Sequence, residues 1–208
     1  MTGPAIPLKN DPRIAFFDRH APKWDTYGPP PEHTKARLEA LLPALGLEAG
    51  HDVLEVGCGT GQVTGWLEGV VRPGRVTAVD FSPAMIDAAR QRGIAASFVL
   101  ADVCGVPLGI ARFDVAFCMH VFPHFRDAAA ALSNIARTLK PSGRLVVLHL
   151  IGRAQINHVH HHAGGPVSED RLPDGNHWAL MLEKVGLRLL EVRDEEDLFL
   201  LTATRDAS

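Results

Sequence analysis

The segment 53–62, Val-Leu-Glu-Val-Gly-Cys-Gly-Thr-Gly-Gln, constrains the fold of this chain more than any other. A short apolar run contains Glu55, three glycines alternate at positions 57, 59 and 61, and a helix-compatible stretch follows. This order predicts a buried strand that enters a tight turn without Cβ atoms, so that a ligand can lie directly on the backbone. A carboxylate at the end of such a strand suits a positively charged ligand and fits poorly beside a pyrophosphate.

Length and charge narrow the class of protein. The 208 residues fit one domain with a substantial core, and the net charge of −3 gives no sign of a basic groove for nucleic acid. No apolar run approaches the roughly 20 residues that cross a bilayer, and the N-terminus lacks a signal-peptide core. Three cysteines without paired spacing indicate reduced thiols. We therefore expect a cytoplasmic protein with no nucleic-acid or membrane partner.

Strand and helix patterns alternate along most of the chain. Strands are expected at 52–56, 75–79, 97–100, 113–118 and 144–150, and helices at 32–45, 61–70, 83–92, 127–139, 153–162 and 174–185. Two final β-rich runs, 187–193 and 197–204, are joined by a turn too short for a crossover, which predicts an antiparallel hairpin. The fold class is therefore α/β, a doubly wound, Rossmann-like sheet of seven strands that is mostly parallel.

Two further carboxylates follow the next strands. Asp80 ends the expected second strand and Asp102 comes after the third. The carboxyl ends of parallel strands meet at the ligand-binding edge of such a sheet, where we expect both residues to join Glu55. A carboxylate there can accept two hydrogen bonds from a ribose diol. The three together suit a ligand that has an ammonium group, a ribose and an adenine but no phosphate, although a simple turn role for Asp102 is the alternative.

The glycine motif resembles the first motif of class I S-adenosylmethionine-dependent methyltransferases, hydrophobic-hydrophobic-Glu/Asp-hydrophobic-Gly-x-Gly-x-Gly. Residues 80–86 resemble the D-x-S-x-x-M/L stretch of that family, and residues 139–145 resemble its L-K-P-G-G-x-L turn, with Ser142 in place of one glycine. The resemblance covers about residues 50–150. In the competing dinucleotide-binding fingerprint, G-x-G-x-x-G, the third glycine comes one residue later than it does here.

The resemblance implies S-adenosyl-L-methionine as cofactor and S-adenosyl-L-homocysteine as product. It also implies a set of cofactor-binding residues: Glu55, Gly57, Cys58, Gly59, Gly61, Asp80, Phe81, Met85, Asp102, Val103 and Cys118. In this set Asp102 and the Val103 backbone would bind adenine, and Phe81 and Met85 would enclose the ring. For Met85, a place in the core is an equal alternative.

The resemblance also implies a division of the single domain, 1–208. An N-terminal lid segment, 1–31, precedes the cofactor-binding core at 50–150, the substrate-side helices at 151–186 and the terminal hairpin at 187–205. In the lid segment, Trp24 and Tyr27 would close over the sulfonium, because aromatic faces attract cations. The alternative is that both aromatic residues anchor this segment to the core.

The chain carries eleven histidines, several of them near the expected cleft. His120 and His124 follow the fourth strand, and His160 lies in the helix expected after the fifth; each is a candidate general base for a hydroxyl acceptor. Structural roles are the alternative for all three.

The helix expected at 153–162 also offers a polar face. Arg153 and Asn157 lie on that face with His160 and His161, which indicates contact with a polar substrate. A weaker alternative is a metal held by His158 and His162 at i, i+4 spacing, with Glu169 or Asp170 as a further ligand. A solvated, histidine-rich helix end is the plain alternative, so no metal is assigned.

These patterns predict an enzyme that transfers a methyl group from S-adenosylmethionine to a small-molecule acceptor. The alternatives are a protein or RNA methyltransferase, a non-catalytic S-adenosylmethionine-binding module and an NAD-dependent oxidoreductase. An Asn-Pro-Pro-Tyr motif, typical of many nucleic-acid amino-methyltransferases, is absent after the fourth strand. The sequence leaves open the acceptor, the methylated atom, the role of the histidine cluster at 158–162 and the oligomeric state.

Overall fold

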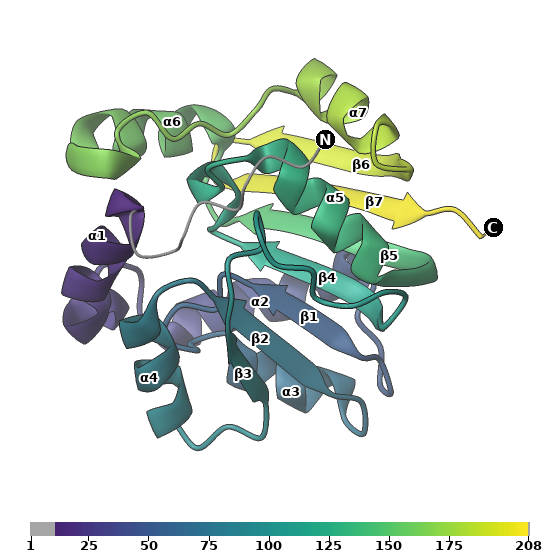
Figure 1. Cartoon of the computed structure of the whole chain (residues 1–208), viewed down its shortest axis with the longest axis horizontal. Helices are drawn as coiled ribbons and strands as arrows, with labels where there is room; N and C mark the ends of the chain where they lie inside the picture. Colours follow the sequence, from purple (N-terminus) through teal and green to yellow (C-terminus); the bar gives the residue numbers. More distant parts are fainter. Residues whose placement is uncertain (1–10, 208) are drawn as a thin grey trace.

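The protein folds around one seven-stranded sheet with helices on both faces (Figure 1). The structure, a computed structural model, describes residues 11–207, so the first ten residues of the expected lid segment lie outside it. The strands are β1 (Val53–Val56), β2 (Val76–Asp80), β3 (Ser97–Leu100), β4 (Phe113–Met119), β5 (Leu139–His149), β6 (Leu187–Glu195) and β7 (Leu198–Arg205). Their order across the sheet is β3-β2-β1-β4-β5-β7-β6.

Helices follow the strands in the expected alternation. The α-helices are α1 (Pro12–His20), α2 (Pro31–Leu45), α3 (Thr64–Val71), α4 (Pro83–Gln91), α5 (Ala128–Thr138), α6 (Arg153–Ala163) and α7 (Gly175–Glu183). Short 3-10 helices are η2 (Ala21–Thr26), η3 (Phe122–His124) and η4 (Gly165–Val167). Ser82 and Asp127 begin α4 and α5, each accepting a hydrogen bond from a backbone N–H three residues on.

Strand pairing confirms the predicted fold class. β1 to β5 pair in parallel, whereas β7 pairs antiparallel with both β5 and β6. Two boundaries differ by more than two residues from those predicted. α3 begins at Thr64 rather than at position 61, because the three glycines before it all have positive φ and cannot start a right-handed helix. β5 begins at Leu139, five residues early, and its register with β4 shifts near Phe113.

Two large apolar clusters fill the space between the sheet and its helices. One lies under α5 and α7, where Ile135 and Trp178 are fully buried, and the other lies under α2 and α3, where Leu38 and Leu67 are fully buried. Each such side chain stabilises the fold by about 1.5–3 kcal/mol. Both faces of the central strands are therefore apolar, and polar chemistry is confined to the strand ends.

A third, smaller cluster holds the N-terminal segment against the carboxyl edge of the sheet. It consists of Phe17 and Ala21 from the N-terminal segment, Met85 from α4 and Val167 from η4. In Figure 1, α1 lies beside the carboxyl-edge side of the molecule, near α4 and α6. The strand order reverses between β1 and β4, and open α/β sheets bind ligands at the crevice formed there. Among residues 11–207, no helix has the length and apolar character to cross a membrane.

Candidate active site

A cavity opens at the reversal point of the strand order, where open α/β sheets bind their ligands. Residues that follow four successive strands surround it. Of the residues expected to bind the cofactor, Gly57, Asp80, Phe81, Asp102 and Val103 line this cavity, as does the candidate base His124.

The glycine turn forms one wall of the cavity. Gly57 and Cys58 both donate their backbone N–H to the Val79 carbonyl, at 2.8 and 3.0 Å, which ties the turn to β2. Gly57 has φ +71, and a Cβ at this position would lie 2.2 Å from the Val121 Cγ2 atom. A residue other than glycine would therefore be strained and would collide with the chain after β4.

Asp80 links the glycine turn to α4. Its Oδ2 atom accepts the N–H of Gly59 and its Oδ1 atom accepts the N–H of Ser82, both at 2.9 Å. Burial raises the pKa of Asp80 to about 6. The backbone hydrogen bonds favour the charged form and so limit this rise. Asp80 is thus mainly anionic at neutral pH, and each oxygen keeps a lone pair for a further donor.

Asp102 is held in a similar way at the next strand end. Its Oδ1 atom accepts the N–H of Cys104 at 2.8 Å, and its Oδ2 atom lies 2.6 Å from Arg126 Nη2. Arg126 also lines the cavity, but its charge is paired with Asp102 and is not free to bind an anionic ligand.

Glu55 does not line the cavity. It is 3% exposed, and its Oε2 atom accepts a hydrogen bond from Thr64 Oγ1 at 2.6 Å. Burial raises the pKa of Glu55 to about 8, and the hydrogen bond from Thr64 only partly offsets this. In the structure Glu55 fastens the start of α3, and its contact with an ammonium group stays a prediction.

Three more expected cofactor residues are packed in apolar surroundings. Met85 lies in the third cluster with Phe17, and Cys118 is fully buried between sheet and helices. Cys58 points into the core with 7% exposure. The structure does not bring these side chains to the cavity, which fits the core alternative for Met85.

The N-terminal segment is bound to the glycine turn. Asp25 accepts a hydrogen bond from Thr60 Oγ1 at 2.5 Å and pairs with Arg92. The Trp24 Nε1 atom lies 3.3 Å from where a Cβ of Gly59 would be. Trp24 thus lies beside the glycine turn, and its closure over the sulfonium stays a prediction.

Asp18 and Tyr27 also belong to this segment, and only Asp18 is fastened to the rest of the site. Asp18 accepts hydrogen bonds from Ser82 Oγ at 2.5 Å and from the Ala84 N–H at 3.2 Å, so it fastens α1 to the start of α4. Tyr27 is 60% exposed, so its ring does not close over the cavity as predicted.

A pair of histidines ends the next two strands. His120 follows β4 with φ +55, and its ring lies edge-on to His149, the last residue of β5, with centroids 5.2 Å apart. His120 reaches solvent but is crowded by protein, and this desolvation, with the charges of His124 and Arg37, lowers its pKa to about 4. His149 is 2% exposed, burial lowers its pKa, and its Nε2 atom has no partner among the described residues.

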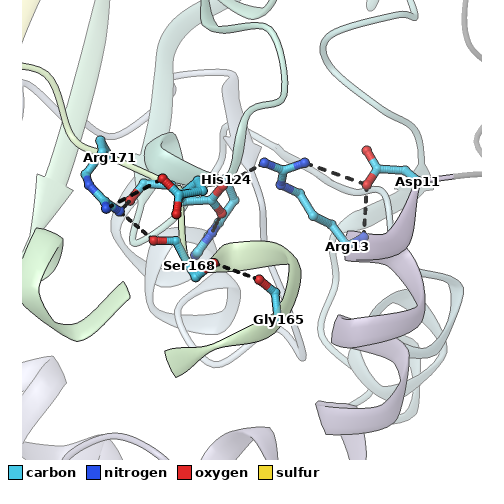
Figure 2. A network of polar contacts seen from close by, with 8 residues as sticks. Asp11, Arg13, His124, Gly165, Ser168 and Arg171 are labelled. Atoms are coloured by element: carbon cyan, nitrogen blue, oxygen red, sulfur yellow. Dashed lines mark hydrogen bonds and ion pairs between the residues drawn. The ribbon is translucent and has the colours of Figure 1, made fainter. Parts of the chain in front are cut away.

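His124, which also follows β4, belongs to a buried ionic network (Figure 2). The Nδ1 atom of His124 lies 2.7 Å from Asp170 Oδ2, and Arg13 Nη2 donates to Asp170 Oδ1 at the same distance. Burial raises the pKa of Asp170, but these two partners outweigh it and the net pKa is lowered. The ring of His160 lies 4.8 Å from that of His124.

Sequence reasoning missed Arg13 and considered Asp170 only as a metal ligand. The two residues are 157 positions apart, and Asp170 is 46 positions from His124. No local pattern signals such a network. An arginine among the aromatic residues of the N-terminal segment was the one available hint.

The polar face of α6 has partners other than the cavity. Arg153 binds Asp194 through its backbone N–H and its Nε atom, both at 3.0 Å. Asn157 exchanges two hydrogen bonds with the Leu172 backbone, at 2.8 and 3.3 Å. Both residues therefore fasten α6 to its neighbours, whereas a substrate role stays a prediction.

The suggested metal ligands at the end of α6 have local contacts. His158 and His162 are exposed, with ring centroids 4.2 Å apart, and His162 Nδ1 lies 2.8 Å from the His158 carbonyl. Within residues 11–207, no group of three or more candidate ligands is close enough to hold a metal ion.

Sequence comparison relates the chain to known methyltransferases. Residues 54–147 match the family described as "Methyltransferase domain". Methyltransferase GfsG of Streptomyces halstedii is 30% identical over 199 residues, which cover 88% of this chain and 70% of the relative. A ubiquinone biosynthesis O-methyltransferase of Alkalilimnicola ehrlichii is 30% identical over 191 residues, covering 85% and 76%. The chain spans less of other relatives, such as 40% of a malonyl-[acyl-carrier protein] O-methyltransferase of Serratia marcescens, to which it is 40% identical over 106 residues.

Solved structures agree on the fold. A SAM-dependent methyltransferase from Aquifex aeolicus superposes with a TM-score of 0.69 at 24% identity, covering 90% of this chain and 97% of that one. The [4+2]-cyclase SpnF superposes with a TM-score of 0.75 at 18% identity, covering 94% and 96%. Because the fold alone also serves a cyclase, the assignment rests on the sequence matches. The chain belongs to the class I S-adenosylmethionine-dependent methyltransferases and is an enzyme of that family.

Proposed function

We propose that this enzyme transfers the methyl group of S-adenosylmethionine to a small-molecule acceptor, and that the cavity at the carboxyl edge of the sheet holds the cofactor. The observation that carries the proposal is the lining of that cavity, in which Asp80 and Asp102 stand at adjacent strand ends beside the bare backbone of Gly57. Carboxylates in this place suit the hydroxyl and amino groups of an adenosine and disfavour a pyrophosphate.

The lining residues fit the cofactor part by part. Asp80 would accept the two ribose hydroxyls, Asp102 would accept the adenine amino group, and the face of Phe81 would cover the ring. Gly57 would present its bare backbone to the methionine moiety, because it lines the cavity and its missing side chain lets the turn pack against Val121. When bound, the cofactor supplies a methyl group on a positively charged sulfur. The protein holds the acceptor in line with that methyl group and keeps water away.

Three observations favour a small acceptor over a macromolecule. The N-terminal segment lies across the glycine turn through Trp24 and Asp25, which leaves little access for a folded partner. One relative is named as an O-methyltransferase of ubiquinone biosynthesis. The net charge of −3 also disfavours RNA.

Two measurements test the proposal. Calorimetry on the full chain should show binding of S-adenosylhomocysteine and none of NAD; the opposite result would refute the cofactor assignment. Incubation of cell extract with enzyme and methyl-labelled S-adenosylmethionine should then label the dialysable fraction. Label confined to retained protein or RNA would support the macromolecular alternative, and binding without any label would support a non-catalytic module.

A further inference from the structure

We propose that His124 is the general base of the methyl transfer, that Asp170 positions it, and that the acceptor atom is therefore a hydroxyl oxygen. This inference rests on the proposed methyl transfer and names the class of acceptor. Sequence reasoning left His120, His124 and His160 as equal candidates, and the contacts of the four histidines near the cavity separate them.

The Asp170 carboxylate determines which nitrogen of His124 carries the proton. An ionised carboxylate only accepts hydrogen bonds, so at 2.7 Å the Nδ1 atom of His124 must donate. The Nε2 atom of a neutral His124 then carries the free lone pair. His124 lies on η3, directly after β4, and lines the cavity, so its ring stands where an acceptor would approach the methyl group.

Arg13 keeps Asp170 ionised. The Asp170 side chain is 1% exposed, and burial alone would favour its neutral form. The Arg13 guanidinium at 2.7 Å and the His124 ring outweigh that effect, and the pKa of Asp170 is lowered. A buried anion on the Nδ1 side both orients the imidazole and stabilises the imidazolium that forms when Nε2 accepts a proton.

The other histidines lack this arrangement. Desolvation and the neighbouring His124 charge lower the pKa of both His120 and His160 to about 4, which makes them weak proton acceptors. The Nδ1 atom of His160 and the Nε2 atom of His149 have no hydrogen-bond partner among the described residues. Among the four, His124 alone has a carboxylate bonded to its ring in the part of the chain that the structure describes.

The chemistry accounts for why a base is needed. As the acceptor oxygen attacks the methyl carbon, its O–H proton moves to His124 Nε2, the new O–CH₃ bond forms and the S–CH₃ bond breaks. The bond's electron pair stays on sulfur, giving neutral S-adenosylhomocysteine, and the imidazolium later returns its proton to water. A thiol ionises readily near neutral pH and needs no such help, whereas a hydroxyl does.

Nuclear magnetic resonance on the full chain saturated with S-adenosylhomocysteine tests the positioning role of Asp170. Long-range ¹H–¹⁵N spectra should show His124 protonated at Nδ1 and bare at Nε2, and D170N should abolish this preference. D174N is the matched control, since Asp174 makes the same contact with His177 Nδ1 at 2.8 Å on the exposed surface. A proton on Nε2 in the wild type, or no change in D170N, would overturn the proposal.

Kinetics test the base itself, with phenol and thiophenol as acceptor probes. H124Q keeps the Arg13–Asp170 pair and should lower kcat for phenol roughly 10²–10⁴-fold, and kcat for thiophenol by a much smaller factor. In D170N the acidic limb of the rate–pH profile should move to lower pH, because the charge that stabilises the imidazolium is gone. The groups facing His124 that also titrate or carry charge are Arg13, Asp80, His120 and His160.

Each result bears on one proposal. Equal losses with both probes in H124Q, or an unmoved pH profile in D170N, would refute the base role. If the wild type methylates neither probe, the nuclear magnetic resonance result decides alone. Failure of the wild type to bind S-adenosylhomocysteine would instead refute the proposed function.

Discussion

The carboxyl edge of the sheet has two halves that are built differently. The carboxylate half carries Glu55, Asp80 and Asp102 at the ends of β1, β2 and β3, and each carboxylate accepts at least one hydrogen bond within the protein. The histidine half carries His120, His124, His149 and His160 near the ends of β4 and β5, and two of its buried ring nitrogens have no partner among residues 11–207. One half is thus internally bonded, while the other keeps polar atoms available.

Burial acts on both halves in the same physical way and with opposite sign. It raises the pKa values of Glu55 and Asp80 and lowers those of His120, His149 and His160, because desolvation always disfavours the charged form. Neutral rings at His120, His149 and His160 suit an uncharged acceptor beside a cationic sulfur. The difference between the halves fits the proposal that a preformed cofactor site lies beside a site that the acceptor completes.

The largest expected effect comes from the contact between Gly57, which follows β1 in the carboxylate half, and Val121, which follows β4 in the histidine half. Gly57→Ala places a Cβ 2.2 Å from Val121 Cγ2 at φ +71. Left-handed strain of about 1–2 kcal/mol and overpacking of about 1–3 kcal/mol should lower the free energy of unfolding by about 2–5 kcal/mol. Urea unfolding measures this loss.

Two further variants separate its causes. Val121→Ala in the Gly57→Ala background removes the 2.2 Å contact but keeps the Val121 Cβ atom at 2.6 Å. It should therefore restore part of the stability lost to overpacking and leave the backbone strain. Gly69→Ala in α3, where a Cβ meets nothing within 4 Å, should be neutral or stabilising by up to about 1 kcal/mol. A double variant as unstable as Gly57→Ala alone would show that the halves do not press on each other there.

The same division explains how much the sequence could predict. The carboxylate half is local: Asp80 and Asp102 each bind a backbone N–H two residues on, so motif and strand pattern located them. The alternation of strand and helix patterns likewise predicted the parallel strands, and the short turn near the C-terminus predicted the antiparallel hairpin. The histidine half depends on contacts such as Arg13–Asp170, which only the folded chain brings together. The inward turn of the Glu55 side chain toward Thr64 was equally hidden, since a strand-end position does not reveal which way a side chain points.

The next largest effect tests the carboxylate half. Asp80→Ala removes the acceptor of the Gly59 and Ser82 N–H groups and the proposed ribose ligand. S-adenosylhomocysteine binding measured by calorimetry should weaken by about 1–3 kcal/mol, the scale of a hydrogen bond to a charged group. Asp87→Ala is the control, because Asp87 is an exposed carboxylate on α4 with the same charge. Equal affinities in both variants would contradict the role of Asp80.

The smallest effect at neutral pH concerns the unpartnered Nε2 atom of His149, and this effect grows as acid is added. Because burial lowers the pKa of His149 below its ordinary 6.5, the unfolded chain binds a proton that the folded chain resists, and the free energy of unfolding falls as pH drops below about 6.5. One such group contributes a slope of at most about 1.4 kcal/mol per pH unit.

His149→Leu and His149→Gln each remove this group. In both variants the free energy of unfolding should therefore fall less steeply than in the wild type between about pH 6.5 and 4. His120 and His160, whose pKa values are lowered to about 4, should keep the rest of the slope. At pH 8 only the leucine variant should match or exceed the wild-type stability, because leucine leaves no buried polar atom without a partner at this position. Identical slopes in all three proteins would show that the fold does not hold His149 neutral.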